Sequence, residues 1–129
     1  MAELNHTIVH SRDRRASAAF LAGVLGVEVG PDWGPFTPVH LGNGVSLDYE
    51  QTDRDIVPQH YAFLVTDAEF ERGLAVVRDG GHEIWADPWL SRPGEINKHY
   101  GGRGFYFRDP DGHLLELLTA PYGDVPESD

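Results

Sequence analysis

Residues 101–119 read GGRGFYFRDPDGHLLELLT and predict a β-hairpin. The aromatic run at 105–107 favours one strand, Asp-Pro-Asp-Gly at 109–112 is a turn signal, and the leucines at 114–118 favour a second strand. Glu116 lies inside this apolar second strand, and alternation along the strand puts it on the same face as two leucines. A buried unpaired charge is costly. We therefore expect Glu116 to be exposed, paired with a basic residue, or bound to a metal.

The composition is that of a small globular protein. The chain has 129 residues, 40% hydrophobic and 24% charged, with no apolar run near the roughly 20 residues of a membrane span and no signal-peptide pattern at its start. It contains no cysteine, so any metal must be held by nitrogen and oxygen ligands. A net charge of -11 disfavours nucleic acid and anionic membranes as partners. We expect a single cytoplasmic domain.

The first part of the chain predicts the order β-α-β-β-β. An alternating strand at residues 4–10 is followed by a helix that Ser11 or Asp13 can cap and that Gly26 ends. Three further strands are expected, at residues 27–29, 37–41 and 45–50.

The second part repeats this order. A strand at residues 59–65 precedes a helix that starts with a Thr66 capping box and ends at Gly80, and a strand follows at 82–85. After a long connection the final hairpin completes the unit. The sequence thus predicts two modules within one domain, about residues 4–51 and 58–119, and a solvated tail at 120–129.

The repeat brings four polar residues into correspondence. His60 opens its strand as His6 opens the first, and Asp48 and Glu116 each lie four residues after the glycine of the preceding turn. Two histidines and one carboxylate are the composition of a facial triad for a divalent metal. We therefore expect His6, His60 and Glu116 to be metal ligands, which would also explain the position of Glu116 among leucines.

The stretch GFYFRDPDGHLLEL at residues 104–117 resembles the final hairpin of the vicinal oxygen chelate superfamily, which includes glyoxalases, extradiol dioxygenases, and bleomycin and fosfomycin resistance proteins. The resemblance covers about residues 4–119. It implies an α+β fold in which two paired βαβββ modules form an eight-stranded, incompletely closed mixed sheet around a metal or ligand pocket. It also implies His6, His60 and Glu116 as the ligands.

The resemblance leaves several activities open. Asp48 matches a fourth ligand position of some glyoxalases, which usually have glutamate there, and nothing basic follows Glu116 as fosfomycin enzymes require. We therefore favour dioxygenase-like chemistry on a small aromatic or vicinal-oxygen substrate. The alternatives are a glyoxalase-like lyase or isomerase, and a non-catalytic protein that sequesters an aromatic antibiotic or metabolite, as bleomycin resistance proteins do.

The same resemblance implies the cofactor, the base and the assembly. Fe(II) is the first expectation for the metal, with Mn(II), Zn(II) and Ni(II) as alternatives. A base must accept a phenol proton, and we favour Tyr100 and His99 over His10 and Tyr61. Family members of this size commonly pair, so a homodimer is expected. The connection at residues 87–104 is long enough to be a lid over the pocket.

Overall fold

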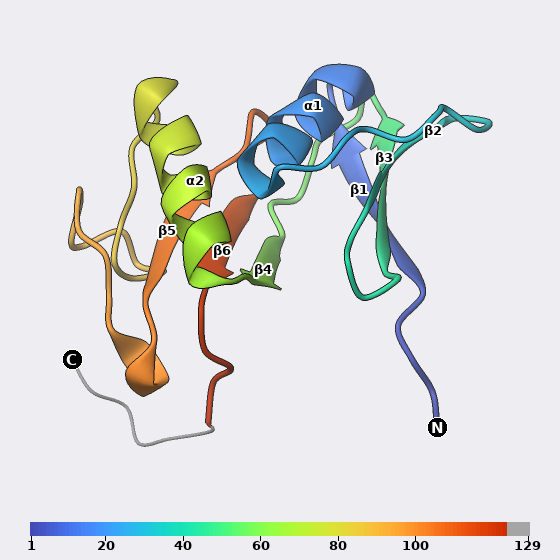
Figure 1. Cartoon of the computed structure of the whole chain (residues 1–129). Coiled ribbons are helices and arrows are strands. Elements are labelled where there is room, and N and C mark those ends of the chain that lie inside the picture. Colours follow the sequence, from blue (N-terminus) through green and yellow to red (C-terminus); the bar gives the residue numbers. More distant parts are fainter. Residues whose placement is uncertain (124–129) are drawn as a thin grey trace. The chain divides into compact units, whose positions relative to one another are not determined.

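The computed structural model describes residues 1–123. Contacts divide the chain into two compact units, Met1–Val57 and Pro58–Asp129, and each is described by itself. In Figure 1 the first unit is coloured from blue to green and the second from green to red. In the described part of the chain, no helix is long and apolar enough to cross a membrane.

The first unit is a three-stranded sheet with one helix. Its elements in chain order are β1 (His6–Ser11), α1 (Arg14–Leu25), β2 (Phe36–His40) and β3 (Ser46–Gln51). Strand β3 lies in the middle, parallel to β1 and antiparallel to β2. Apolar side chains from the strands and the helix are buried and make up the core of this unit: Val9, Leu21, Val24, Val39, Leu47 and Tyr49.

Helix α1 begins and ends as the sequence predicted. The carboxylate of Asp13 accepts a hydrogen bond from the amide of Ala16 at 3.1 Å, so Asp13 rather than Ser11 is the N-cap. The hydroxyl of Ser11 instead donates to Ser17 at 2.8 Å. Gly26 ends the helix with φ at 74°, a left-handed conformation that glycine adopts without strain.

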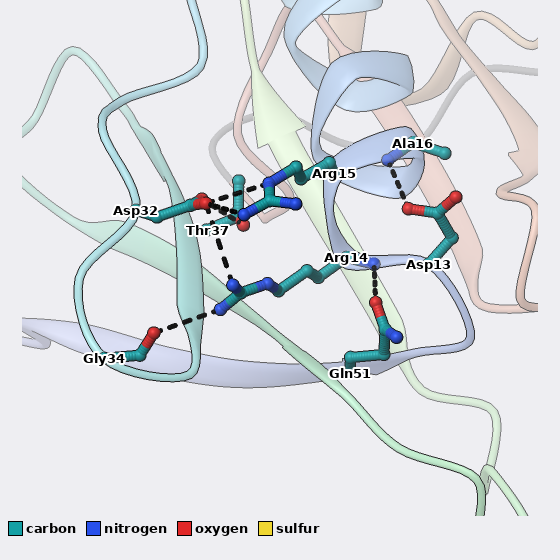
Figure 2. Close-up of polar contacts among 8 residues, drawn as sticks. All are labelled: Asp13, Arg14, Arg15, Ala16, Asp32, Gly34, Thr37 and Gln51. Atoms are coloured by element: carbon teal, nitrogen blue, oxygen red, sulfur yellow. Dashed lines mark hydrogen bonds and ion pairs between the residues drawn. The ribbon is translucent and has the colours of Figure 1, made fainter.

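An arginine cluster fastens the segment between α1 and β2 to the start of the helix. Figure 2 shows Arg14 and Arg15 converging on Asp32. The Arg15 Nε donates to Asp32 at 2.8 Å, and the Thr37 hydroxyl donates to the other carboxylate oxygen at 2.6 Å. These contacts, Thr37 first, lower the pKa of Asp32. Positive side chains are unfavourable at a helix N-terminus, and the carboxylate offsets that charge.

The second unit has the same order of elements. They are β4 (His60–Leu64), α2 (Asp67–Asp79), β5 (Gly104–Arg108) and β6 (Leu114–Leu118). Strand β6 lies in the middle, parallel to β4 and antiparallel to β5. The core is largely aromatic and aliphatic, with these side chains buried: Phe63, Phe70, Leu74, Val77, Phe105, Phe107, Leu115 and Leu117. The predicted hairpin is therefore confirmed as β5 and β6.

The capping box of α2 is also confirmed. The Thr66 hydroxyl accepts from the amide of Glu69 at 3.2 Å, and the Glu69 carboxylate accepts from the amide of Thr66 at 2.8 Å. This reciprocal pair satisfies two amides that the helix itself leaves without acceptors. The helix ends at Gly80, as predicted.

The eight predicted strands are only partly visible, because residues 1–123 contain six strands. The segment at 27–29 is reduced to a single bridge between Val29 and Val39. The amide of Gly30 bonds to the carbonyl of Pro38 at 2.9 Å as part of this bridge, and Pro38 has no amide with which to return the bond. Continuous pairing with β2 therefore stops there, and a separate bridge joins Trp33 to Phe36.

The segment at 82–85 shortens in the same way. Trp85 exchanges both backbone hydrogen bonds with Tyr106 of β5, at 2.9 and 2.8 Å. The amide of the next residue, Ala86, bonds instead to the carbonyl of Arg92 at 3.2 Å, inside the long connection. Two positions along β5, Gly104 exchanges both of its backbone hydrogen bonds with Asn97 of the connection, at 2.8 and 3.1 Å, so the pairing of Trp85 does not extend along β5 in that direction.

Candidate metal centre

The two units place their candidate residues in the same register. In the first unit, the residue two positions beyond His6 lies directly opposite Asp48 of β3. In the second unit, the residue two positions beyond His60 lies directly opposite Glu116 of β6. The correspondence of His6 with His60 and of Asp48 with Glu116, predicted from the sequence, is therefore also found in the strand register.

His60 and Glu116 meet in the second unit. The Nε2 of His60 lies 3.2 Å from Oε1 of Glu116, and its Nδ1 lies 2.9 Å from the carbonyl oxygen of Leu114. A carbonyl only accepts, so Nδ1 carries a proton, and in a neutral ring Nε2 presents a lone pair to the carboxylate. Two acceptors that face each other at this distance need a proton or a cation between them.

The geometry of this pair fits a divalent cation. Nitrogen and oxygen ligands lie about 2.0–2.2 Å from such an ion, so neighbouring ligand atoms are about 3 Å apart. The carbonyl of Leu114 orients the ring of His60 as the carbonyl partner of a ligating histidine does. Glu116 is only 1% exposed, so water cannot satisfy its charge.

The other oxygen of Glu116 is occupied by a tyrosine. The hydroxyl of Tyr122 donates to Oε2 of Glu116, and the hydroxyl of Tyr106 lies 3.0 Å from the Tyr122 oxygen. Tyr122 has one hydroxyl proton, which is used on Glu116, so Tyr106 is the donor in the second bond. The ring of Tyr106 also stacks on His60, with centroids 5.8 Å apart.

Both tyrosines are held in the protonated form. Burial raises the pKa of Tyr106 to about 12. Burial likewise raises the pKa of Tyr122, and its hydrogen bond to Glu116 raises it further. At neutral pH both phenols are therefore hydrogen-bond donors: Tyr106 donates to Tyr122, and Tyr122 donates to the Glu116 carboxylate.

The corresponding residues of the first unit are arranged differently. His6 is exposed, and its Nδ1 lies 2.7 Å from the side-chain oxygen of Asn5. Asp48 is buried, and its Oδ1 accepts from the Ser46 hydroxyl at 2.7 Å. Within neither unit, over residues 1–123, do three or more candidate ligands gather. The three-ligand set of His6, His60 and Glu116 stays a prediction.

The two favoured bases lie in a short 3-10 helix, η1 (His99–Gly101), and their role stays a prediction. The Tyr100 ring lies against Tyr122, with centroids 4.9 Å apart, and His99 meets the edge of Tyr100 at 6.4 Å. Tyr100 therefore packs on the ring of Tyr122, and the hydroxyl of Tyr122 contacts Glu116.

The other two base candidates lie elsewhere. His10 forms an ion pair with Glu50 at 3.2 Å in the first unit. Tyr61 contacts the edge of the buried His113, with centroids 6.1 Å apart.

Hydrogen bonds inside the connection at residues 87–104 hold its shape. Asp87 accepts from the amides of Ser91 and Arg92 at 3.0 and 3.1 Å, and the Ser91 bonds contribute to lowering the pKa of Asp87. The buried Asn97 donates from its side chain to the carbonyl of Ala86 at 2.9 Å. Its use as a lid stays a prediction.

Tyr122 is the site residue that the sequence did not reveal. We expected residues 120–129 to be a solvated tail; Tyr122 is 47% exposed, yet its hydroxyl is bound to Glu116, which the sequence did not predict. A tyrosine six residues beyond the candidate ligand, just after a proline, is a weak signal because no strand or helix pattern orients it. Residues 124–129 lie outside the described part of the chain.

Comparison with known proteins identifies the family. The profile of the Glyoxalase/Bleomycin resistance protein/Dioxygenase superfamily matches residues 3–117. The protein named glutathione transferase FosA from Serratia marcescens is 32% identical over 120 residues, which span 88% of this chain and 78% of that protein.

Solved structures agree with this match. The oxidase ChaP-H2 is 56% identical with a TM-score of 0.93, over 95% of this chain and 96% of its own. The oxidase ChaP-H1 is 54% identical with a TM-score of 0.93, over 95% of this chain and 99% of its own. The fosfomycin resistance protein FosX from Mesorhizobium loti shares the fold, with 22% identity and a TM-score of 0.71 over 95% of each chain. The chain therefore belongs to the Glyoxalase/Bleomycin resistance protein/Dioxygenase superfamily, the vicinal oxygen chelate group that its final hairpin resembles.

Proposed function

We propose that this chain is a divalent-metal-dependent enzyme with dioxygenase-like chemistry on a small aromatic or vicinal-oxygen substrate. The observation that carries the proposal is the pair formed by His60 and the buried Glu116, with Nε2 and Oε1 at 3.2 Å and the histidine tautomer set by a backbone carbonyl. The relatives named oxidases, at 54–56% identity over 95% of the chain, support oxidative chemistry.

His60 and Glu116 would hold the metal, and His6 would be the third ligand because it occupies the equivalent strand position in the first unit. Fe(II) is the proposed ion, with Mn(II), Zn(II) and Ni(II) as alternatives. When bound, such an ion supplies Lewis acidity and a template for neighbouring substrate oxygens.

The chain's own side chains would then handle the proton. A phenol proton of the substrate would pass to the neutral imidazole of His99, or to Tyr100 acting as the phenolate. Tyr106 does not suit this task, because burial raises its pKa to about 12 and keeps its phenol protonated. A homodimer and a cytoplasmic location complete the proposal.

A glyoxalase-like reaction receives less support from the first unit. That reading needs a fourth ligand at Asp48, and the Ser46 hydroxyl already occupies one of its carboxylate oxygens at 2.7 Å. We therefore place dioxygenase-like chemistry ahead of it.

Metal binding under anaerobic conditions tests the proposal. Apo protein is titrated with Fe(II), for wild type, His60→Ala and the control His10→Ala, whose histidine is paired with Glu50 instead. We expect stoichiometric binding in wild type and control, and affinity at least about 100-fold lower in His60→Ala. Oxygen uptake with a set of catechols then tests the reaction. A folded wild type that binds no metal would point instead to a non-catalytic binding protein.

A further inference from the structure

We propose that Tyr122 is a positioning residue for Glu116: its hydroxyl occupies Oε2, so that Oε1 alone is presented to a metal beside His60 Nε2. The inference rests on the proposed metal-binding function. It assigns a role to a residue beyond the last strand, in a segment whose sequence shows only a proline and a glycine around the tyrosine.

The backbone brings Tyr122 to this place through close packing at Gly102. The amide of Thr119 bonds to the carbonyl of Arg103 at 2.9 Å, and the amide of Arg103 bonds to the Thr119 hydroxyl at 2.8 Å. A Cβ on Gly102 would lie 2.7 Å from both the Ala120 Cβ and the Thr119 hydroxyl oxygen. Only glycine lets the two segments approach this closely, so the chain leaves β6 along one defined path.

Side-chain contacts then orient the Tyr122 ring. It lies against Tyr100, with centroids 4.9 Å apart, and its hydroxyl receives a hydrogen bond from Tyr106 at 3.0 Å. Tyr100 itself has φ at 54°, which a residue with a side chain adopts only when its surroundings hold it there. The side chain of Tyr122 is thus held by the backbone path at Gly102, by packing against the Tyr100 ring and by the hydrogen bond from Tyr106.

The carboxylate needs such a donor. Glu116 is 1% exposed, and an ionised carboxylate has two oxygens to satisfy. Oε1 faces His60, and Tyr122 is the donor that the structure gives to Oε2; without it the group could turn and offer both oxygens to one ion. By holding Oε2, Tyr122 favours a single-oxygen ligand and leaves more coordination positions for substrate.

The test compares Tyr122→Phe with wild type and with the matched control Tyr61→Phe. Tyr122→Phe removes only the hydroxyl and keeps the ring that packs on Tyr100. The control loses a hydroxyl from a ring of the same unit that contacts His113, and leaves the bond between Tyr122 and Glu116 in place. Far-UV circular dichroism verifies that all three proteins are folded.

Apo proteins are titrated with Co(II), whose visible absorption reports both affinity and coordination. We expect Tyr122→Phe to bind Co(II) about 10- to 100-fold more weakly, with an altered absorption band, and Tyr61→Phe to match wild type. Equal affinity and an identical band in Tyr122→Phe would overturn the inference and leave the proposed metal site standing. A wild type that binds neither Co(II) nor Fe(II) would overturn both.

Discussion

The two units share one backbone plan and differ in what they do with it. In each, the residue two positions beyond a histidine lies opposite a buried carboxylate residue, Asp48 in the first unit and Glu116 in the second. In the second unit His60 and Glu116 are 3.2 Å apart, whereas in the first unit His6 bonds to Asn5. Equivalent register therefore does not produce an equivalent site.

The side chain two residues before each carboxylate accounts for much of the difference. Ser46 precedes Asp48 on the same face of β3 and donates to it at 2.7 Å. Leu114 has the same place before Glu116 and cannot donate, so Glu116 finds its partners on His60 and Tyr122. Glutamate is also one methylene longer than aspartate. Asp48 thus has a donor two residues away, whereas Glu116 is bound by side chains from other segments of the chain.

The largest expected effect concerns the two equivalent carboxylates, Glu116 in the second unit and Asp48 in the first. Glu116→Gln keeps the size of the side chain and removes its charge, and we expect metal affinity to fall at least about 100-fold. Asp48→Asn, the matched change in the first unit, should alter affinity by less than about threefold because Ser46 already satisfies that group. Calorimetric titration with Mn(II) measures both. Similar losses in the two variants would make Asp48 a ligand as well.

A second prediction uses one glycine from each unit. Gly102→Ala places a Cβ 2.7 Å from Ala120 and Thr119, so we expect the free energy of unfolding to drop by about 1–3 kcal/mol. Gly23→Ala in α1 meets no atom within 4 Å and should gain about 0.5–1 kcal/mol from helix propensity. Urea unfolding gives both values.

The same pair also reports on Tyr122. Displacing residues 119–120 should carry Tyr122 away from Glu116, so Gly102→Ala should lower metal affinity while Gly23→Ala leaves it unchanged. A Gly102→Ala protein that is destabilised but binds metal with wild-type affinity would show that the packing of residues 119–120 does not affect the site.

The third prediction concerns the local donor of the first unit. Ser46→Ala removes the 2.7 Å hydrogen bond to Asp48, which is 4% exposed, and leaves that oxygen without its donor. We expect a loss of about 1–2 kcal/mol in the free energy of unfolding, with metal affinity unchanged. In the Ser46→Ala/Asp48→Asn double variant the charge is gone, so the loss should be smaller. An equal loss in both proteins would contradict this account.

The smallest effect lies in the hairpin turns. The turn of the first unit uses the neutral Asn43, while the second uses Asp109, whose Oδ1 accepts from the amides of Asp111 and His113 and whose Oδ2 is buried without a hydrogen bond. Burial raises the pKa of Asp109 above its usual value of 3.8. Its contribution to stability is therefore fully present below about pH 3.8 and is lost as the pH rises through the folded-state pKa.

Asp109→Asn makes the second turn resemble the first and removes this charge. We expect it to raise the free energy of unfolding at pH 7 by about 1 kcal/mol and to give no gain near pH 3. Thermal unfolding at the two pH values measures the difference. A variant that is equally destabilised at both would show that the Asp109 side chain acts through its hydrogen bonds alone.

The sequence anticipated the order of elements well and the extent of two strands poorly. Alternation, the Thr66 capping box and the glycine at 26 are local signals, and each is found in the structure. The strand expected at 27–29 is a single bridge at Val29, because Pro38 has no amide to return the bond from Gly30, and at 82–85 only Trp85 pairs with β5, where Gly104 bonds to Asn97 instead. Such competition between distant segments leaves no local pattern.

By itself the sequence determined the repeated order of a strand, a helix and two further strands, the caps and turns, and the equivalence of His6 with His60 and of Asp48 with Glu116. These properties follow from residues a few positions apart, whose spacing sets faces and turns. Only the tertiary structure decided that Glu116 meets His60 and Tyr122 while Asp48 is satisfied by Ser46. The physical reason is that a buried carboxylate takes the donors that packing brings within about 3 Å, and Gly102, Tyr100 and Tyr106 set that packing from elsewhere in the chain.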